Sequence, residues 1–250
     1  MNRLIILLTL SYSLALISAV AGAEIKTFRA EYRAEYQGLP IKAKAIRKLD
    51  KKTDNSFRFV STVNSVFIQV TETSEFEYEN LQIRPLSYGY QRKGLGREKS
   101  EKLTFDWRKK SLLFNSKELS PLAAGTLDKL SLQLKLREDV AQIMATNDPI
   151  FNLSYIIADK SKRKPYHFKI LPDEMLETSL GYIRTIPVQR IRNDTVRKTR
   201  FWLSPEFNFL IVKALQIENE SSFELNLIGA EIDGQALKIF ESSVDLYGSQ

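Results

Sequence analysis

The sequence predicts a mainly β protein. We expect an antiparallel, strongly curved sheet, either a half-open barrel or a clam-like fold, with one main α-helix near residues 127–145. Segments rich in β-branched and aromatic residues recur along the chain between short turns. One long segment, residues 128–144, lacks glycine and proline and is rich in good helix formers. Strands and helices do not alternate, so a parallel sheet is not expected.

The N-terminal segment has the features of a secretory signal peptide. Arg3 precedes an apolar run from Leu4 to Leu16, and Ala21-Gly22-Ala23 supplies small residues for cleavage before Glu24. The alternative is an uncleaved anchor, but the run is short for a hydrocarbon core of roughly 30 Å. We therefore expect residues 1–23 to be removed, residues 24–234 to form one β domain with one helix, and residues 235–250 to be a C-terminal appendage. No transmembrane span is expected after signal removal.

The composition indicates the compartment. The chain has no cysteine, so it has neither disulfides nor a thiol for a lipid anchor. An exported chain of this kind suits the bacterial periplasm, with secretion beyond the cell as the lesser alternative. The formal charge is +7, which favours anionic envelope surfaces over nucleic acid as a partner, because the chain is exported.

The first strands show the clearest alternation. Residues 28–36 read FRAEYRAEY, with aromatic residues and alanine on one face and charged residues on the other. After a turn at Gly38-Leu39-Pro40, residues 41–49 alternate again. Further strands are expected at residues 57–63, 66–73, 76–83, 86–91, 102–107, 112–115, 153–158, 166–171, 183–192, 196–203, 209–217 and 223–232. Gly181 and Pro187 are expected breaks or bulges.

The helical segment carries a mixed signal. Leu130 and Leu134 fit one helical face, but Leu132 and Leu136 also fit a strand-like alternation. Good helix formers without β-branched crowding favour the helix, which Asn147-Asp148-Pro149 would end.

The chain offers few groups for catalysis. His167 is the sole histidine and has the opposite parity from Tyr166 and Phe168, which indicates the wetter face of a strand. No nucleophile–base pair and no His/Cys zinc site can be assembled. Glu75, Glu77 and Glu79 share one strand face, for which solvation is the favoured interpretation. We therefore expect no catalytic residue, metal or cofactor.

Five aromatic residues are candidates for binding a ligand: Tyr32, Tyr36, Trp107, Trp202 and Phe209. Trp202 and Phe209 flank the turn at Ser204-Pro205-Glu206. The favoured interpretation is that they clamp a late hairpin onto the core, because large aromatic side chains dominate core burial. Trp202 would belong to a ligand site only if the sheet were open at its concave face.

Four basic residues are candidates for contact with an anionic surface. Arg190 and Arg192 share one parity, as do Lys198 and Arg200. If the two strands pair across Asn193-Asp194, these side chains would form a positive patch for an anionic head group. The favoured interpretation is nevertheless that these side chains are solvated, because exposed strand faces routinely carry lysine and arginine; contact with an anionic head group is the alternative.

Several motifs, taken in order, resemble a bacterial exported family known only as domain of unknown function 3108. They are FRAEYRAEYQGLPIKAKA near the mature start, RPLSYGY at 84–90, LTFDW at 103–107, LDKLSLQLKLRED at 127–139, LETSLGYIRTIPVQRIR at 176–192 and TRFWLSPEFNFLIVKAL at 199–215. The chain departs from the family where Leu210-Ile211-Val212 replaces a proline-containing motif. The resemblance implies a periplasmic β protein, similar to the half-open barrels of lipoprotein carriers, and brings no catalytic residues.

Three hypotheses for function follow. The first is a non-enzymatic periplasmic protein that binds or carries a lipid-like or amphipathic ligand on a curved sheet. The second is a cell-envelope interaction module that docks on an anionic polymer or a protein complex. The third and least favoured is a hydrolase that uses carboxylates.

Overall fold

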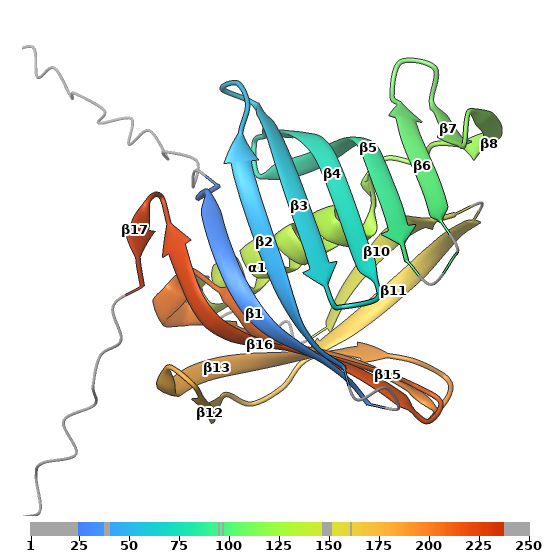
Figure 1. The fold of residues 1–250 in the computed structure, drawn as a ribbon. Helices are drawn as coiled ribbons and strands as arrows, with labels where there is room; N and C mark the ends of the chain where they lie inside the picture. Colours follow the sequence, from blue (N-terminus) through green and yellow to red (C-terminus); the bar gives the residue numbers. More distant parts are fainter. Residues whose placement is uncertain are drawn as a thin grey trace, which may run out of the picture.

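The computed structural model describes residues 25–37, 41–94, 96, 98–146, 152–160 and 162–237 of the 250-residue chain. The expected signal peptide and residues 238–250 of the expected appendage lie outside the described residues. Within these residues the chain forms seventeen strands, one α-helix and one 3-10 turn (Figure 1). The mainly β class and the single main helix are therefore confirmed.

The first half of the chain is an antiparallel meander in which each strand pairs with the next. The predicted alternation in the first strand corresponds to alternating burial: Phe28, Ala30, Tyr32 and Ala34 are all buried. The strands are β1 Phe28–Gln37, β2 Ile41–Lys51, β3 Ser56–Asn64, β4 Gln69–Glu79, β5 Gln82–Lys93, β6 Lys99–Asp106, β7 Ser111–Phe114 and β8 Lys117–Pro121.

The second half holds the helix and the remaining strands. Its elements are β9 Thr126–Leu127, α1 Lys129–Thr146, β10 Asn152–Asp159, β11 Lys162–Ile170, β12 Glu174–Thr178, β13 Gly181–Ile191, β14 Arg197–Ser204, the 3-10 turn η1 Pro205–Phe207, β15 Leu210–Glu218, β16 Ser221–Ile232 and β17 Gln235–Ala236.

Pairing of β16 with β1 joins the two halves into one sheet. Along the paired neighbours the order is β8-β7-β6-β5-β4-β3-β2-β1-β16-β15-β14-β13-β11-β10-β9. The short β9–β10 pairing is parallel, and in the described part β8 and β9 do not pair with each other. The sheet is thus strongly curved but not closed, and α1 lies on its concave side behind β1–β4 (Figure 1).

Two expected strands have wrong boundaries. The expected strand 76–83 is interrupted by a two-residue turn at Asn80 and Leu81, whose φ angles are 52° and 60°. The turn contains no glycine, and residues 75–79 alternate between polar and aromatic side chains up to the turn itself. The alternation pattern therefore did not reveal the hairpin. The expected strand 66–73 begins only at Gln69, because residues 65–68 form the tip of the β3–β4 hairpin.

Pro187 interrupts pairing as expected. One edge of β13 pairs with β12 up to Thr185 and with β11 from Val188 onward. Pro187 lies between these segments, where the missing N–H of proline breaks no ladder bond on that edge. The strand β12 was not predicted from the sequence.

The helix begins at a well-formed cap. The Asp128 carboxylate accepts hydrogen bonds from the backbone N–H groups of Leu130 at 2.8 Å and Ser131 at 2.9 Å. In return, the Ser131 hydroxyl oxygen accepts the backbone N–H of Asp128 at 2.9 Å. The Ser74 hydroxyl on β4 also donates to Asp128 at 2.6 Å. This reciprocal cap satisfies free backbone donors and fixes the start of α1 to the sheet.

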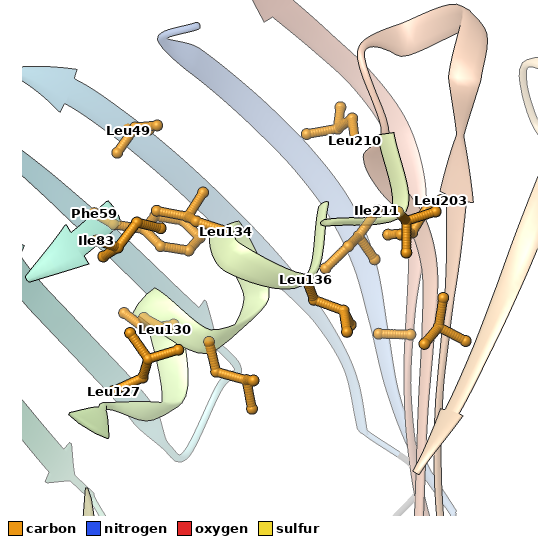
Figure 2. Close-up of a cluster of buried hydrophobic side chains, with 14 of the residues drawn as sticks. Leu49, Phe59, Ile83, Leu127, Leu130, Leu134, Leu136, Leu203, Leu210 and Ile211 are labelled. Carbon is orange, nitrogen blue, oxygen red and sulfur yellow. The ribbon is translucent and has the colours of Figure 1, made fainter. Parts of the chain in front are cut away.

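The mixed leucine pattern of the helix is explained by its surroundings. Leucines two positions apart lie on roughly opposite sides of a helix, because each residue advances the helix by about 100°. Leu134 points toward Phe59 on β3, whereas Leu136 points toward Ile211 on β15 (Figure 2). The curved sheet therefore contacts the helix from both sides, and both sides are apolar.

Candidate functional site

A hollow lined by described residues, here the polar cavity, lies beside the first turns of α1. Its volume is about 700 Å³, and its walls come from α1, β10, β11 and β13–β16, with single contributions from β2 and β4. Its basic lining residues are Arg47, Lys129, Lys160, Lys164, Arg190, Arg192 and Arg197, and its acidic lining residues are Glu72, Asp159 and Glu218. Seven basic against three acidic side chains give this cavity an excess of positive charge.

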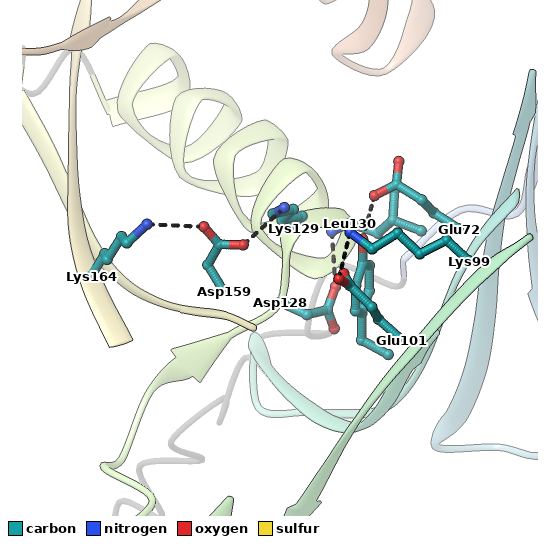
Figure 3. A network of polar contacts seen from close by, with 9 residues as sticks. Glu72, Lys99, Glu101, Asp128, Lys129, Leu130, Asp159 and Lys164 are labelled. Atoms are coloured by element: carbon teal, nitrogen blue, oxygen red, sulfur yellow. Dashed lines mark hydrogen bonds and ion pairs between the residues drawn. The ribbon is translucent and has the colours of Figure 1, made fainter. Parts of the chain in front are cut away.

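Two of the lysines share one carboxylate as their ion-pair partner. Asp159 pairs with Lys129 at 2.9 Å and with Lys164 at 3.2 Å (Figure 3). Burial alone would raise the pKa of Asp159, but its hydrogen bonds and ion pairs with the two lysines lower that pKa overall. The carboxylate is therefore ionised at neutral pH and is already engaged by cations.

The arginines on β13 lack such partners. The guanidinium of Arg190 lies 3.1 Å from the ring centroid of Tyr166, and Arg192 donates to the Thr199 hydroxyl at 3.1 Å. Within the described residues neither arginine forms an ion pair, whereas neighbouring Arg197 pairs with Asp194 at 2.6 Å. Burial lowers the pKa of Arg190, and the nearby charges of Arg192 and Arg197 lower it further. The result is a cluster of mutually repelling cations at the cavity wall.

A further cation lies on the wall formed by β2. Arg47 is only 7% exposed, donates to the side-chain oxygen of Gln133 at 2.9 Å and lies over the Tyr32 ring. Its Nε is buried without a hydrogen-bond partner in the described part of the chain. Arg47 thus adds a buried positive charge, and the two groups that it contacts, the Gln133 side chain and the Tyr32 ring, are neutral.

A second hollow, here the apolar cavity, lies among β1–β5 near the tip of the β3–β4 hairpin. Its volume is about 340 Å³. Ala34 and Ala43 lie opposite each other in the β1–β2 register and both line it. Their small side chains leave space that larger residues would fill. The rest of the wall is largely apolar and includes Tyr36, which is 40% exposed.

The two cavities meet at Phe223. This residue lines both hollows. In the sheet it lies opposite Tyr36 of the apolar cavity on one side and opposite Gln216 of the polar cavity on the other. A cationic space and an apolar space therefore adjoin on the concave side of the sheet.

Of the five predicted aromatic residues, the structure places Tyr36 in the wall of these cavities. Tyr32 is buried in the core and its hydroxyl donates to the Ile211 carbonyl at 2.8 Å. The indole N–H of Trp107 donates to the Pro85 carbonyl at 2.6 Å. Both side chains have their polar groups satisfied within the protein.

The late aromatic residues also lie outside the two cavities. Trp202 is 6% exposed, and its indole N–H donates to Glu174 on β12 at 2.5 Å. Its neighbour Phe201 lines the polar cavity, so Trp202 points to the opposite face of β14. Phe209 is partly buried against the core. The structure therefore does not bring Trp202 and Phe209 together with Tyr36.

The four predicted basic residues are divided between the faces of the sheet. Arg190 and Arg192 line the polar cavity. Arg200 lies opposite Gln189 and donates to its side chain, on the other face of the sheet. Lys198 shares the parity of Arg200, yet it borders a third hollow of about 350 Å³ that Arg190 and Arg192 also line. Odd or even position along a strand shows which residues share a face of the sheet, but it could not show which of the two faces is concave.

Sequence reasoning missed several lining residues. Arg47 continues the parity of the buried Ala45, so a cation on the apolar face of a strand was an available signal. Lys164 was not proposed as a site residue, yet it pairs with Asp159 at 3.2 Å. Arg197 and Phe223 had no distinguishing local pattern.

Potential metal ligands and the histidine were located in the described residues. No group of three or more histidine, aspartate and glutamate residues there is placed to hold a metal ion. His167 is exposed, lies outside both cavities and contacts the Ser154 hydroxyl through Nδ1 at 3.0 Å.

The fold and cavities define a barrel-like β protein with an internal hollow. A family model matches residues 31–227, so the chain belongs to the family described as protein of unknown function (DUF3108). No curated protein matches this sequence. The chain is similar in fold to a solved β-barrel-like protein of domain of unknown function DUF1849 from Brucella abortus, with a TM-score of 0.51 and 9% identity. That match covers 83% of this chain and 98% of the other. In the described residues, no helix combines the length and apolar character that a bilayer crossing requires.

Proposed function

We propose that this is a non-enzymatic, exported protein of the periplasm that binds or carries a lipid-like, amphipathic ligand on the concave side of its sheet. The observation that carries the proposal is the junction at Phe223, where the polar and apolar cavities adjoin. An amphipathic molecule has one end suited to each space.

Physical chemistry supports this assignment. Ligand pockets of about 300–1,000 Å³ are typical for small molecules, and both cavities fall in that range. Each methylene that moves from water into an apolar space contributes about 0.8 kcal/mol. The polar cavity would keep the other end of the ligand in a charged environment. The periplasmic location rests on the N-terminal sequence.

The alternative of an envelope-docking module has less support. It requires all four predicted basic side chains on one face, and although Arg190, Arg192 and Lys198 line one hollow of about 350 Å³, Arg200 lies on the other face of the sheet.

Binding of a dansyl-labelled undecanoic acid, followed by its fluorescence, tests the proposal. The wild-type protein should enhance the probe signal, and Ala43→Phe should weaken binding at least tenfold, because a phenyl ring would occupy the apolar cavity. Ala145→Leu is the matched control, since Ala145 is exposed on α1 and lines neither cavity.

Native mass spectrometry of the wild-type protein gives a second measurement that does not depend on a variant. A bound species of lipid mass should accompany protein purified from the cell envelope. Absence of both probe binding and a bound species would refute the proposed function. Undiminished binding by a folded Ala43→Phe protein would show that the apolar cavity is not the site.

A further inference from the structure

We propose that the polar end of the ligand is a phosphate group, held in the polar cavity by the guanidinium groups of Arg190 and Arg192 together with the Thr199 hydroxyl. This inference rests on the proposed function and adds the chemical class of the ligand. It identifies the ligand as a phosphate-bearing amphiphile.

The first argument is unbalanced charge. The Nε atoms of Arg190 and Arg192 are buried and lack hydrogen-bond partners in the described residues. The contacts assigned to these guanidiniums are neutral: the Tyr166 ring and the Thr199 hydroxyl. Burying a cation without an anion is unfavourable. A bound anion would supply both the missing charge and the missing acceptors.

The second argument comes from the opposite wall. Arg47 is 7% exposed, borders the same cavity and also has a buried Nε without a partner. It belongs to β2, far from β13 in the order of strands. Two separate parts of the sheet therefore present arginines with a buried, unpartnered Nε to one hollow; Arg47 is buried, and Arg190 and Arg192 are half-buried.

The third argument distinguishes phosphate from carboxylate. A phosphate monoester carries about −1.5 to −2 charges at neutral pH and offers three strong acceptor oxygens. Guanidinium groups bind such oxygens in a bidentate geometry. A carboxylate has one charge, which leaves more of the cavity's positive charge uncompensated: seven basic side chains face three acidic ones, and among the described residues only Arg197 has a further carboxylate partner, Asp194. Phosphate is therefore the better match to this wall.

The position of Phe223 then gives the orientation. The phosphate end would lie toward β11 and β13, and the apolar chain would pass Phe223 toward Ala34 and Ala43. Phe223 would contact the part of the chain nearest to the phosphate.

Isothermal titration calorimetry with three probes tests this inference: decyl phosphate, uncharged decyl maltoside and inorganic phosphate, each below its aggregation concentration. Decyl phosphate should bind the wild type at least tenfold more tightly than either other probe. The double variant R190Q/R192Q should weaken decyl phosphate binding about 30-fold or more, since charge-assisted hydrogen bonds are lost. Its affinity for decyl maltoside should stay within twofold.

Arg200→Gln is the matched control, because it removes the same charge from the opposite face of the neighbouring strand. It should leave decyl phosphate binding within twofold of the wild-type value. Melting temperatures and decyl maltoside binding check that each variant is folded.

The outcomes separate the two proposals. Equal binding of decyl phosphate and decyl maltoside, or no effect of R190Q/R192Q, would overturn the phosphate assignment and leave amphiphile binding intact. Inorganic phosphate binding as tightly as decyl phosphate would assign the cluster to free phosphate and overturn the amphiphile class. Failure of both decyl compounds to bind would refute the proposed function as well.

Discussion

Two leucines on one helix face very different surroundings. Leu134 is 2% exposed and points toward Phe59, in a region where the associated hollow is only about 10 Å³. Leu132 is 4% exposed but borders the polar cavity of about 700 Å³. Leu134 meets aromatic residues of the core, whereas Leu132, near the start of the helix, borders a hollow whose walls carry arginines and lysines. Side-chain chemistry on the facing strands therefore decides which side of α1 is packed and which is hollow.

The largest expected effect contrasts these two leucines. Leu134→Ala should lower the free energy of unfolding by about 3 kcal/mol, because it opens a cavity in a packed core. Leu132→Ala should lower it by about 1–2 kcal/mol, since a side chain beside an existing hollow loses fewer contacts. Urea unfolding of both variants measures the difference. If both variants lost the same free energy of unfolding, Leu132 would be packed as tightly as Leu134, which would contradict the presence of a hollow beside it.

The helix cap gives the next effect. Asp128→Ala should lower the free energy of unfolding by about 2 kcal/mol, because the Leu130 and Ser131 N–H groups and the Ser74 hydroxyl lose a buried acceptor. Asp128→Asn is the control, since its amide oxygen still accepts hydrogen bonds. Thermal and urea unfolding should rank wild type, Asn and Ala in that order, and an equal loss for both variants would contradict the capping role.

Glu138 on the packed side should make stability depend on pH. Burial raises its pKa to about 7, although the Tyr78 hydroxyl, Lys135 and Arg137 lower it. Because the folded-state pKa is raised, the protonated form is favoured by folding, and its stabilising effect is full below the ordinary pKa of 4.5 and is lost as the pH rises through about 7.

The variant Glu138→Gln cannot ionise, so it should be more stable than the wild type by about 1–2 kcal/mol at pH 8, allowing for partial solvent screening. The difference should shrink toward pH 5. Urea unfolding at several pH values measures it, and a difference independent of pH would count against a raised pKa.

The smallest expected effect belongs to the hollow side. Arg190→Gln should raise the free energy of unfolding by about 0.5–1 kcal/mol at low salt, because it removes a buried cation that lacks a carboxylate partner in the described residues. Arg200→Gln should lower it by about 0.5 kcal/mol, since Arg200 loses its hydrogen bonds to Gln189. A loss of stability in both variants would indicate that Arg190 serves packing rather than binding.

The sequence predicted local elements well where one face is uniformly buried. The alternation in β1 placed Phe28, Ala30, Tyr32, Ala34 and Tyr36 on the buried face; the first four are buried, whereas Tyr36 at the end of the strand is 40% exposed. The turn at Asn80 and Leu81 was missed because its positive φ angles are not marked by glycine. The alternation of the leucines from Leu130 to Leu136 was a true signal of burial on two sides, although by itself it could not distinguish a buried helix from a strand.

The candidate site was predicted only in fragments. Tyr36, Arg190 and Arg192 line the cavities, whereas Trp202 and Arg200 point to the opposite face of β14. Parity assigns residues to two faces, but it does not say which face becomes concave.

The sequence by itself determined the β class, the single main helix, predicted near residues 127–145 and observed at Lys129–Thr146, and the scarcity of catalytic groups, because these depend on local periodicity and residue type. Only the tertiary structure decided where the hollow lies and which cations face it. The β1–β16 pairing places Phe223 opposite Tyr36 although nearly the whole domain separates them in sequence. The curvature of the sheet then turns Arg190 inward and Arg200 outward. Such long-range pairing and curvature have no signature in any short segment of the chain.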